Sequence, residues 1–408
     1  MRLRLAVVVS HPIQHFAPWH REISRQKEID LRVFFCCDWG LSEYVDPNFE
    51  VAVKWDIPLL EGYDYEILPI TKRPKDLSFW EVDNPAVQPS LDSFDPDVVQ
   101  VFGYAHRTNW RAAAWARRRG KPLMLYSDSY YLSSTSWWRR FAKRPLVQHF
   151  YNKVDGAFFV GDNNLAYHLD YGLSPDRLFR GALPIDRERL LTQMPDRETS
   201  RTETRTRLGI PADAFVVLYC GKYIPRKRPL DLVAASAEAA KDGVPVWSIL
   251  VGEGSERGAI EEFCQQERVS NSVLTGFINQ SAIPDYFAAA DVLAVTSSRD
   301  PHPLVISEAS AFGLPVVVSD QVGSIGANDT ARPGVNALVY RCGDRKGLRR
   351  AIETMYKDSE LYRRMAEASR RISETQDAPV VARALAQATN ELHRLGPRTA
   401  VRAKGHPG

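Results

Sequence analysis

Short apolar runs alternate with longer amphipathic segments along most of the chain. The run at residues 5–9 is apolar at every position and predicts a strand buried on both faces, as in parallel sheets. Similar, mostly apolar runs follow in the first half at residues 31–36, 98–102, 123–126 and 157–160. A second series lies at residues 215–220, 246–251, 273–275, 292–296, 315–319 and 337–340. With helical patterns between the runs, the chain is predicted to be an α/β protein.

The helical patterns fit the same architecture. Residues 110–119 end at Gly120, as a helix with a glycine C-cap does. Other helices are predicted at residues 229–241, 283–290, 346–355, 359–375 and 379–395. The polar stretch 194–208 is predicted to be either a linker or an exposed helix that starts the second series.

Two βα series in tandem predict two Rossmann-like, doubly wound parallel-sheet domains that face a central cleft. Ligands of such sheets bind where the carboxyl ends of the strands meet. We place the domains at residues 1–195 and 196–375. A helix at 376–395 is expected to be able to pack back on the first domain, and residues 396–408 are expected to form a disordered basic tail.

The composition removes several classes of protein. A net charge of +3 gives no general case for nucleic-acid binding. The five cysteines show neither a disulfide framework nor a zinc spacing, which fits a reducing, cytoplasmic setting. No run approaches the roughly 20 apolar residues that span a bilayer. Any contact with a membrane is therefore expected to be peripheral, at its inner face.

Three loops in the second half follow predicted strands and suit a phosphate ligand. The first, Gly221 to Arg228, contains the cations Lys222, Arg226 and Lys227, which can neutralise a diphosphate. The second is the Gly252-Glu-Gly254 turn, and the third is Gly276-Phe277. Taken alone, the first fits a solvated basic loop about as well, and for each glycine turn an ordinary βα turn is the better interpretation.

A fourth loop is more specific. Pro303 suits the first turn of a helix, so the N–H groups of Leu304 and Val305 are predicted to form an anion site. Glu308 lies one turn later on the same face, where a carboxylate can accept both hydroxyls of a ribose. Asp300 precedes the helix and can take sugar hydroxyls. The plain alternative for both acids is an ordinary helix-entry or surface position.

In this order the four loops resemble those of the family 4 glycosyltransferases, which are retaining enzymes of the GT-B fold. Their pattern has a Gly-Arg-x-x-x-x-Lys loop, two glycine turns, and two acids with seven residues between them, leading into Glu-Ala-x-Ala-x-Gly-x-Pro-Val. Here the last part reads Asp300 to Glu308 and then Ala-Ser-Ala-Phe-Gly-Leu-Pro-Val316. The dense match covers residues 215–355.

The resemblance implies a nucleotide-sugar domain at 196–375 and an acceptor domain at 1–195. It implies catalytic roles for Lys222 and Lys227 on the diphosphate. The implied donor-binding residues are Arg226, Gly252, Gly254, Phe277, Asp300, His302, Leu304, Val305 and Glu308. Departures from the family are Lys222 for Arg, Asp300 for Glu, Pro301 for Gly and His302 for an aromatic residue. They put the identity of the sugar in doubt more than the presence of a nucleotide.

The first half gives weaker signals. His11 and His15 follow the first strand and are candidates for the acceptor side, although a capping or core role is about as plausible. Tyr104 follows another strand and is a third candidate. Asp128 follows the strand at 123–126, where related enzymes carry a His or Asp facing the anomeric carbon. Its plain alternative is a turn former in a Ser-Asp-Ser run.

A basic aromatic segment in the first half includes Trp137, Trp138, Arg139 and Arg140. On a helix it suits an anionic membrane surface and a lipid-linked acceptor. A packed helix with solvated cations is the plainer interpretation, because no apolar face of several turns is evident.

Together these features predict transfer of a sugar from a nucleotide diphosphate donor to an acceptor, and the resemblance implies retention of configuration. The acceptor is a glycan, a lipid-linked molecule or a small molecule. No cofactor and no metal are expected, and nucleic acid is not an expected partner. The alternatives are a non-catalytic nucleotide-sugar sensor or subunit, and another GT-B enzyme such as a sugar-nucleotide 2-epimerase.

Overall fold

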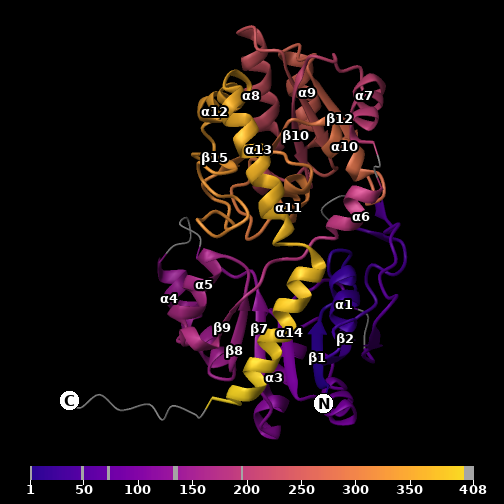
Figure 1. Ribbon diagram of the computed structural model, residues 1–408, viewed down its shortest axis with the longest axis vertical. Helices are drawn as coiled ribbons and strands as arrows, with labels where there is room; N and C mark the ends of the chain where they lie inside the picture. Colours follow the sequence, from indigo (N-terminus) through magenta and orange to yellow (C-terminus); the bar gives the residue numbers. More distant parts are fainter. Residues whose placement is uncertain (1, 47–49, 71–73, 132–136, 194–195, 399–408) are drawn as a thin grey trace, which may run out of the picture.

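The computed structural model describes residues 2–46, 50–70, 74–131, 137–193 and 196–398 of the 408-residue chain. The described chain forms two lobes, each built around a parallel sheet with helices on both faces (Figure 1). The predicted α/β class and the pair of doubly wound domains are therefore confirmed. Most of the predicted basic tail lies outside the described residues.

The N-terminal sheet has seven parallel strands. In spatial order they are β5 (Asp64–Ile67), β2 (Ile29–Phe35), β1 (Leu3–Val9), β6 (Val98–Phe102), β7 (Leu123–Ser127), β8 (Gly156–Phe159) and β9 (Leu178–Arg180). Alternate residues of β1 enter cores on opposite faces, since Leu5 and Val7 join one cluster while Ala6 and Val8 join the other. This explains why the run is apolar at every position. A short antiparallel pair, β3 (Tyr44–Val45) and β4 (Ala52–Val53), stands apart from this sheet.

The C-terminal sheet has six parallel strands. In spatial order they are β12 (Ser272–Gly276), β11 (Val246–Val251), β10 (Phe215–Cys220), β13 (Val292–Val295), β14 (Val316–Ser319) and β15 (Ala337–Tyr340). Here too Val217 faces one core while Leu218 faces the other. Strand order reverses its direction along the sheet at β10 and β13, which is where doubly wound sheets bind ligands.

Helices cover both sheets. Those of the first lobe are α1 (Phe16–Ser24), α2 (Val87–Phe94), α3 (Arg107–Arg119), α4 (Trp137–Tyr151) and α5 (Asp162–Asp170). The second lobe has α7 (Arg197–Arg207), α8 (Pro229–Lys241), α9 (Arg257–Gln266), α10 (Ile283–Ala289), α11 (Leu304–Ala311), α12 (Arg345–Lys357) and α13 (Ser359–Glu374). The short α6 (Arg187–Thr192) lies between the lobes (Figure 1).

The last helix, α14 (Ala378–Leu395), returns to the first lobe, where it runs beside α1 (Figure 1). Its residues Leu385 and Leu392 are fully buried in the same core as β1. The two chain crossings run side by side, because the N–H of Ala378 donates to the carbonyl of Ile185 at 2.9 Å. The lobes are thus joined twice.

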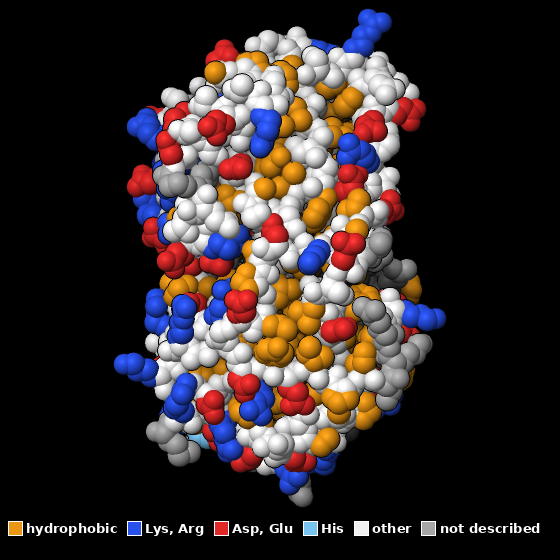
Figure 2. Space-filling view, turned by 90° about the vertical axis from the view of Figure 1, so that its right-hand side faces the viewer, with side chains coloured by type: hydrophobic (Ala, Val, Ile, Leu, Met, Phe, Trp, Pro, Cys, Tyr) orange, Lys and Arg blue, Asp and Glu red, His pale blue; other side chains and the backbone are white. Residues whose placement is uncertain are grey.

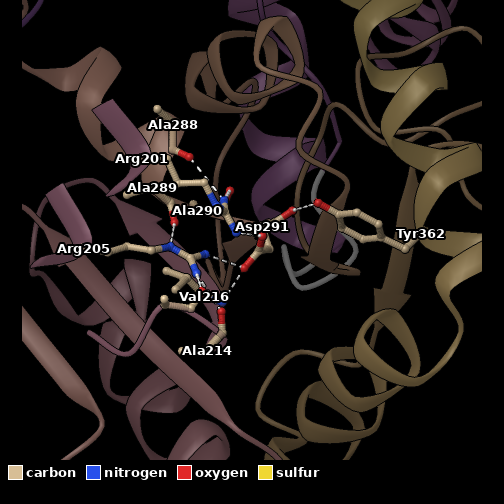
Figure 3. A network of polar contacts seen from close by, with 10 residues as sticks. Arg201, Arg205, Ala214, Val216, Ala288, Ala289, Ala290, Asp291 and Tyr362 are labelled. Atoms are coloured by element: carbon tan, nitrogen blue, oxygen red, sulfur yellow. Dashed lines mark hydrogen bonds and ion pairs between the residues drawn. The ribbon is translucent and has the colours of Figure 1, made fainter. Parts of the chain in front are cut away.

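The polar stretch before the second lobe is a helix, α7, and it is anchored rather than fully exposed. Arg205 is buried, and its guanidinium donates to Asp291 at 2.8 Å and to the carbonyls of Ala289 and Ala214 at 2.9 Å (Figure 3). Arg201 donates to the other carboxylate oxygen of Asp291 at 2.6 Å. The network satisfies a charge that would be costly to bury alone.

Charged side chains of both signs are spread over the face in Figure 2, and apolar side chains gather near its middle. None of the described helices is both long and apolar enough to span a bilayer.

Candidate functional site

A cavity of about 350 Å³ lies between the two lobes. It is lined by Gln14, His15, Tyr44, Asp46, Trp55, Cys220, Gly221, Lys222, Val251, Gly252, Phe277, Ile278, Gln280, Ile283, Leu304, Val305 and Glu308. Seven predicted residues meet here: His15, Lys222, Gly252, Phe277, Leu304, Val305 and Glu308. A cavity of similar volume beside α1 and α6 contains none of the predicted site residues.

The basic loop after β10 supplies cations to the cleft. Lys222 points to the first lobe, with its Nζ at 2.9 and 3.0 Å from the carboxylate oxygens of Asp46. Lys227 forms an ion pair with Asp300. The loop is held in place because the hydroxyl of Thr296 donates to the carbonyl of Lys227 at 2.7 Å. Arg226 reaches the carbonyl of Arg299 at 3.3 Å.

The second glycine loop packs tightly against the first. A Cβ atom on Gly252 would lie 1.9 Å from the carbonyl oxygen of Gly221, and the backbone there has φ of 147°. No larger residue fits without moving the basic loop. Gly254 also has positive φ, at 144°. These glycines let the ends of β10 and β11 approach each other beside the cavity.

Helix α11 begins at the cavity. Pro303 is its N-cap, and Leu304 and Val305 in its first turn line the cavity wall. Glu308 lies one turn further on the same face and lines the cavity too. Burial raises the pKa of Glu308 to about 6. The helix start favours an anion nearby, while Glu308 offers an acceptor for hydroxyl groups.

The loop before α11 departs from the family pattern and is largely buried. Asp300 is buried against Lys227, and its carbonyl accepts from the N–H of Gly323 at 2.8 Å. His302 is also buried, with Nε2 at 3.2 Å from the hydroxyl of Thr330. Burial lowers the pKa of His302 to about 4, so the ring is neutral at pH 7. His302 therefore contacts Thr330 as a neutral ring, and it is not among the residues that line the cavity.

Asp128 follows β7 and faces the second lobe. Burial raises its pKa, and the negative charge of Asp300 adds to the effect, so the two carboxylates are close enough to interact. Tyr130 spans the cleft, with its hydroxyl 3.4 Å from the carbonyl of Gln321. The predicted Asp128 and Asp300 are therefore brought together from opposite lobes.

The other candidates of the first lobe have different surroundings. His11 and His15 are in the same region: burial lowers their pKa values to about 4 and about 3, and His15 lines the cavity. The Nδ1 of His11 lies 2.9 Å from the Ser10 hydroxyl. Tyr104 instead hydrogen-bonds to Tyr167 at 2.7 Å, within an aromatic cluster under α4.

Three residues of the cavity wall had no sequence signal. Tyr44, Asp46 and Trp55 belong to an N-terminal segment with no helical or strand period, and only tertiary contacts bring it to the second lobe. A basic residue such as Lys222 implies a counter-ion, but the sequence does not say which carboxylate supplies it.

The basic aromatic segment forms the start of α4. Trp138 is 55% exposed, whereas the side chains of Trp137, Arg139 and Arg140 lie outside the described part of the structure. Among the described residues, no group of three or more histidine, cysteine or acidic side chains is arranged to hold a metal ion.

Residues 200–372 match the family model described as glycosyl transferases group 1. The chain resembles the group 1 glycosyltransferases. The likeness lies in the half that carries the basic loop and α11, and it agrees with the resemblance noted from the motifs.

Two relatives place the likeness more closely. The lipopolysaccharide core biosynthesis glycosyltransferase LpsE of Rhizobium meliloti (strain 1021) is 36% identical over 163 residues, covering 40% of this chain and 46% of that protein. A D-inositol 3-phosphate glycosyltransferase of Xylanimonas cellulosilytica is 31% identical over 154 residues, covering 36% of each. The match thus spans less than half the length of each relative.

Solved structures extend the likeness of fold to the whole chain. Anabaena Alr3699/HepE, solved in complex with UDP and glucose, superposes with a TM-score of 0.71 over 95% of this chain and 100% of its own, at 17% identity. Sucrose-phosphate synthase from Thermosynechococcus elongatus gives a TM-score of 0.72 over 97% and 100%, at 20% identity. The chain has the GT-B fold.

Proposed function

We propose that this group 1 glycosyltransferase-like protein transfers a sugar from a nucleotide diphosphate sugar to an acceptor, with retention of anomeric configuration. The observation that carries the proposal is the cavity between the lobes. It combines the cation Lys222, the start of α11 and the carboxylate of Glu308. Lys222 and the start of α11 are complementary to a diphosphate, and Glu308 is complementary to the hydroxyls of a ribose.

In this proposal the cleft stabilises the leaving group. As the bond between sugar and diphosphate breaks, negative charge grows on the diphosphate. Lys222, Lys227 and the N–H groups at the start of α11 are the donors that would stabilise that charge electrostatically, which lowers the barrier. Lys222 must exchange its partner Asp46 for phosphate, and Lys227 must share Asp300 with the sugar.

Asp128 is placed for a role at the sugar in this proposal. It faces Asp300 across the cleft; Asp300 is buried and Asp128 is half-buried. A carboxylate there can stabilise positive charge on the ring as the bond breaks, while the departing phosphate takes the proton of the acceptor hydroxyl. No side-chain base is then needed. That transfer needs no metal stays a prediction, which activity in excess chelator would test.

The decisive experiment has two stages. Thermal shifts with UDP-, GDP-, ADP- and TDP-sugars identify the donor, because a ligand that binds only the folded state raises the melting temperature. Acceptor-dependent release of the nucleoside diphosphate then measures transfer, and the anomer of the product is read by NMR. Glu308→Ala should weaken donor binding strongly, while exposed Glu360→Ala serves as the matched control. Normal turnover in Glu308→Ala would overturn the proposed ribose contact.

The two rivals give different results in the same assays. A sugar-nucleotide epimerase converts the donor without any acceptor. A sensor binds the donor without converting it, whatever acceptors are offered. The sensor is considered because the loop of Asp300 and His302 is buried and departs from the family pattern at the sugar end of the donor site.

A peripheral membrane contact through α4 is a separate proposal. Phe141 and Leu146 are 74% and 59% exposed, and the same helix carries exposed Trp138 and the cations Lys143 and Arg144, of which Arg144 is paired with Asp170. Exposed aromatics next to cations suit an anionic lipid surface. Phe141→Glu should reduce the sedimentation of the protein with vesicles of anionic lipid. Sedimentation with zwitterionic vesicles is expected to be low for wild type and unchanged in the variant. Equal binding of wild type and Phe141→Glu to anionic vesicles would refute the contact.

A further inference from the structure

One segment of the first lobe reaches across to the second, and its anchors lie on both sides of Trp55. The carbonyl of Lys54 accepts from the side chain of Asn279 at 2.6 Å. The carboxylate of Asp56 accepts from the N–H of Ser281 at 3.2 Å and also from its hydroxyl. Residues 279–281 follow the strand β12. Trp55 is therefore held at the C-terminal lobe by its two neighbours in sequence.

These anchors set the indole against the donor cavity. The ring of Trp55 lies 6.3 Å from that of Phe277, centroid to centroid, and both rings line the cavity. Tyr44, from the same part of the first lobe, lines the cavity as well. Trp55 is only partly buried, so part of its large apolar surface remains available for a ligand.

The cavity wall combines polar and apolar side chains. Lys222 and Glu308 are among the polar ones, whereas Phe277, Ile278 and Ile283 are apolar. A nucleoside diphosphate also has both kinds of surface, because its phosphates and ribose are polar and its base is flat and poorly hydrated. Aromatic side chains bind bases by contact with their faces and tolerate any base.

We propose that Trp55 forms the outer wall of the base site, so that the N-terminal lobe contacts the nucleotide as well as the acceptor. The inference rests on the proposed donor site and adds a residue to it. Asp56 and Asn279 act as positioning residues, since they fix Trp55 without touching the donor. The base site is then complete only when the two lobes are docked at residues 54–56 and 279–281.

The test compares ligands with and without a base. Binding of the nucleoside diphosphate selected by the donor screen, and of inorganic pyrophosphate, is measured by calorimetry for wild type, Trp55→Ala and Trp55→Phe. We expect Trp55→Ala to weaken nucleotide binding roughly tenfold to a hundredfold, the range seen when a base loses an aromatic partner. Pyrophosphate binding should not change, and Trp55→Phe should recover most of the loss.

Controls separate local from general effects. Trp80→Ala removes an indole that is 73% exposed and outside the cavity, and it should bind both ligands as wild type does. Asp56→Ala should weaken nucleotide binding less than Trp55→Ala and spare pyrophosphate. Melting curves without ligand confirm that each variant is folded.

Other outcomes overturn the inference. Equal nucleotide affinity in Trp55→Ala and wild type would show that the base does not contact the indole. A Trp55→Ala variant in which only the KM for acceptor changes would show the same. Equal loss of both ligands would make Trp55 a structural residue of the interface. Failure of wild type to bind any nucleoside diphosphate would instead refute the proposed function, which keeps the two failures distinct.

Discussion

The ion pair between Lys222 and Asp46 leads to a counterintuitive prediction, because it occupies the cation that the donor needs. Asp46→Asn keeps the shape of the side chain and removes its charge. If a diphosphate must displace Asp46 from Lys222, then the variant should bind nucleoside diphosphate more tightly than wild type. If Asp46 instead bound the donor directly, Asp46→Asn would weaken nucleotide binding.

The expected size follows from the geometry. The side chains of Lys222 and Asp46 are 26% and 12% exposed, so the pair is neither fully solvated nor dry. Two unit charges 4 Å apart interact by about 1 kcal/mol in water and about 4 kcal/mol at an effective dielectric constant of 20. After Asp46 moves aside, about 1–2 kcal/mol of repulsion between its carboxylate and the bound diphosphate is expected to remain in wild type. Its removal in Asp46→Asn is roughly a 5- to 30-fold change in Kd.

Calorimetric titration with the nucleoside diphosphate measures this change. Exposed Asp213→Asn, in the loop at the amino end of β10, removes the same charge and should leave Kd unaltered. The gain in Asp46→Asn should shrink in 0.5 M salt, because added ions screen the repulsion. An unchanged or weaker affinity in Asp46→Asn would refute the displacement of Asp46 by phosphate.

Three further predictions concern single residues. Because burial raises the pKa of Glu308 to about 6 and its ionised form is the hydroxyl acceptor, nucleotide affinity should fall as pH drops through 6. The terminal phosphate of the ligand titrates in the same range, so Glu308→Gln should reduce the dependence to that of the phosphate, and an undiminished dependence would assign it elsewhere. Asp128→Asn should lower turnover at least tenfold without changing nucleotide Kd; unaltered turnover would exclude Asp128 from the chemistry. Asp291→Ala should reduce the free energy of unfolding by about 3–5 kcal/mol in denaturant titrations, since it leaves the charge of Arg205 buried without its carboxylate partner. Asp242→Ala, which removes an exposed pair with Arg349, should reduce it by under about 1 kcal/mol.

The sequence identified those elements whose burial leaves a pattern. The strand at 215–220 and the helix at 229–241 have the predicted limits, because every residue of the strand is apolar and Pro229 opens the helix. The edge strand β5 was missed, since its sequence Asp-Tyr-Glu-Ile is mostly exposed and carries two acids. The three-residue β9 is too short to show any period.

The same contrast holds for the site. Motif residues such as Lys222 and Glu308 follow strands of one sheet, and shared strand direction alone brings them to one edge. Asp46 and Trp55 reach the cavity through contacts between lobes, which no local pattern encodes. Tyr104 follows a strand as the cavity residues do, yet it turns into an aromatic cluster because Tyr167 offers a hydrogen bond there.

The return of α14 to the first lobe has a consequence for how the protein is made. Leu385 and Leu392 complete the core around β1, but they leave the ribosome only after the whole second lobe. Lobes often fold in order of synthesis, and here the first cannot finish before the second has been translated. A fragment ending near residue 190 should therefore expose an apolar groove and aggregate, and adding residues 376–398 as a separate peptide should restore its solubility.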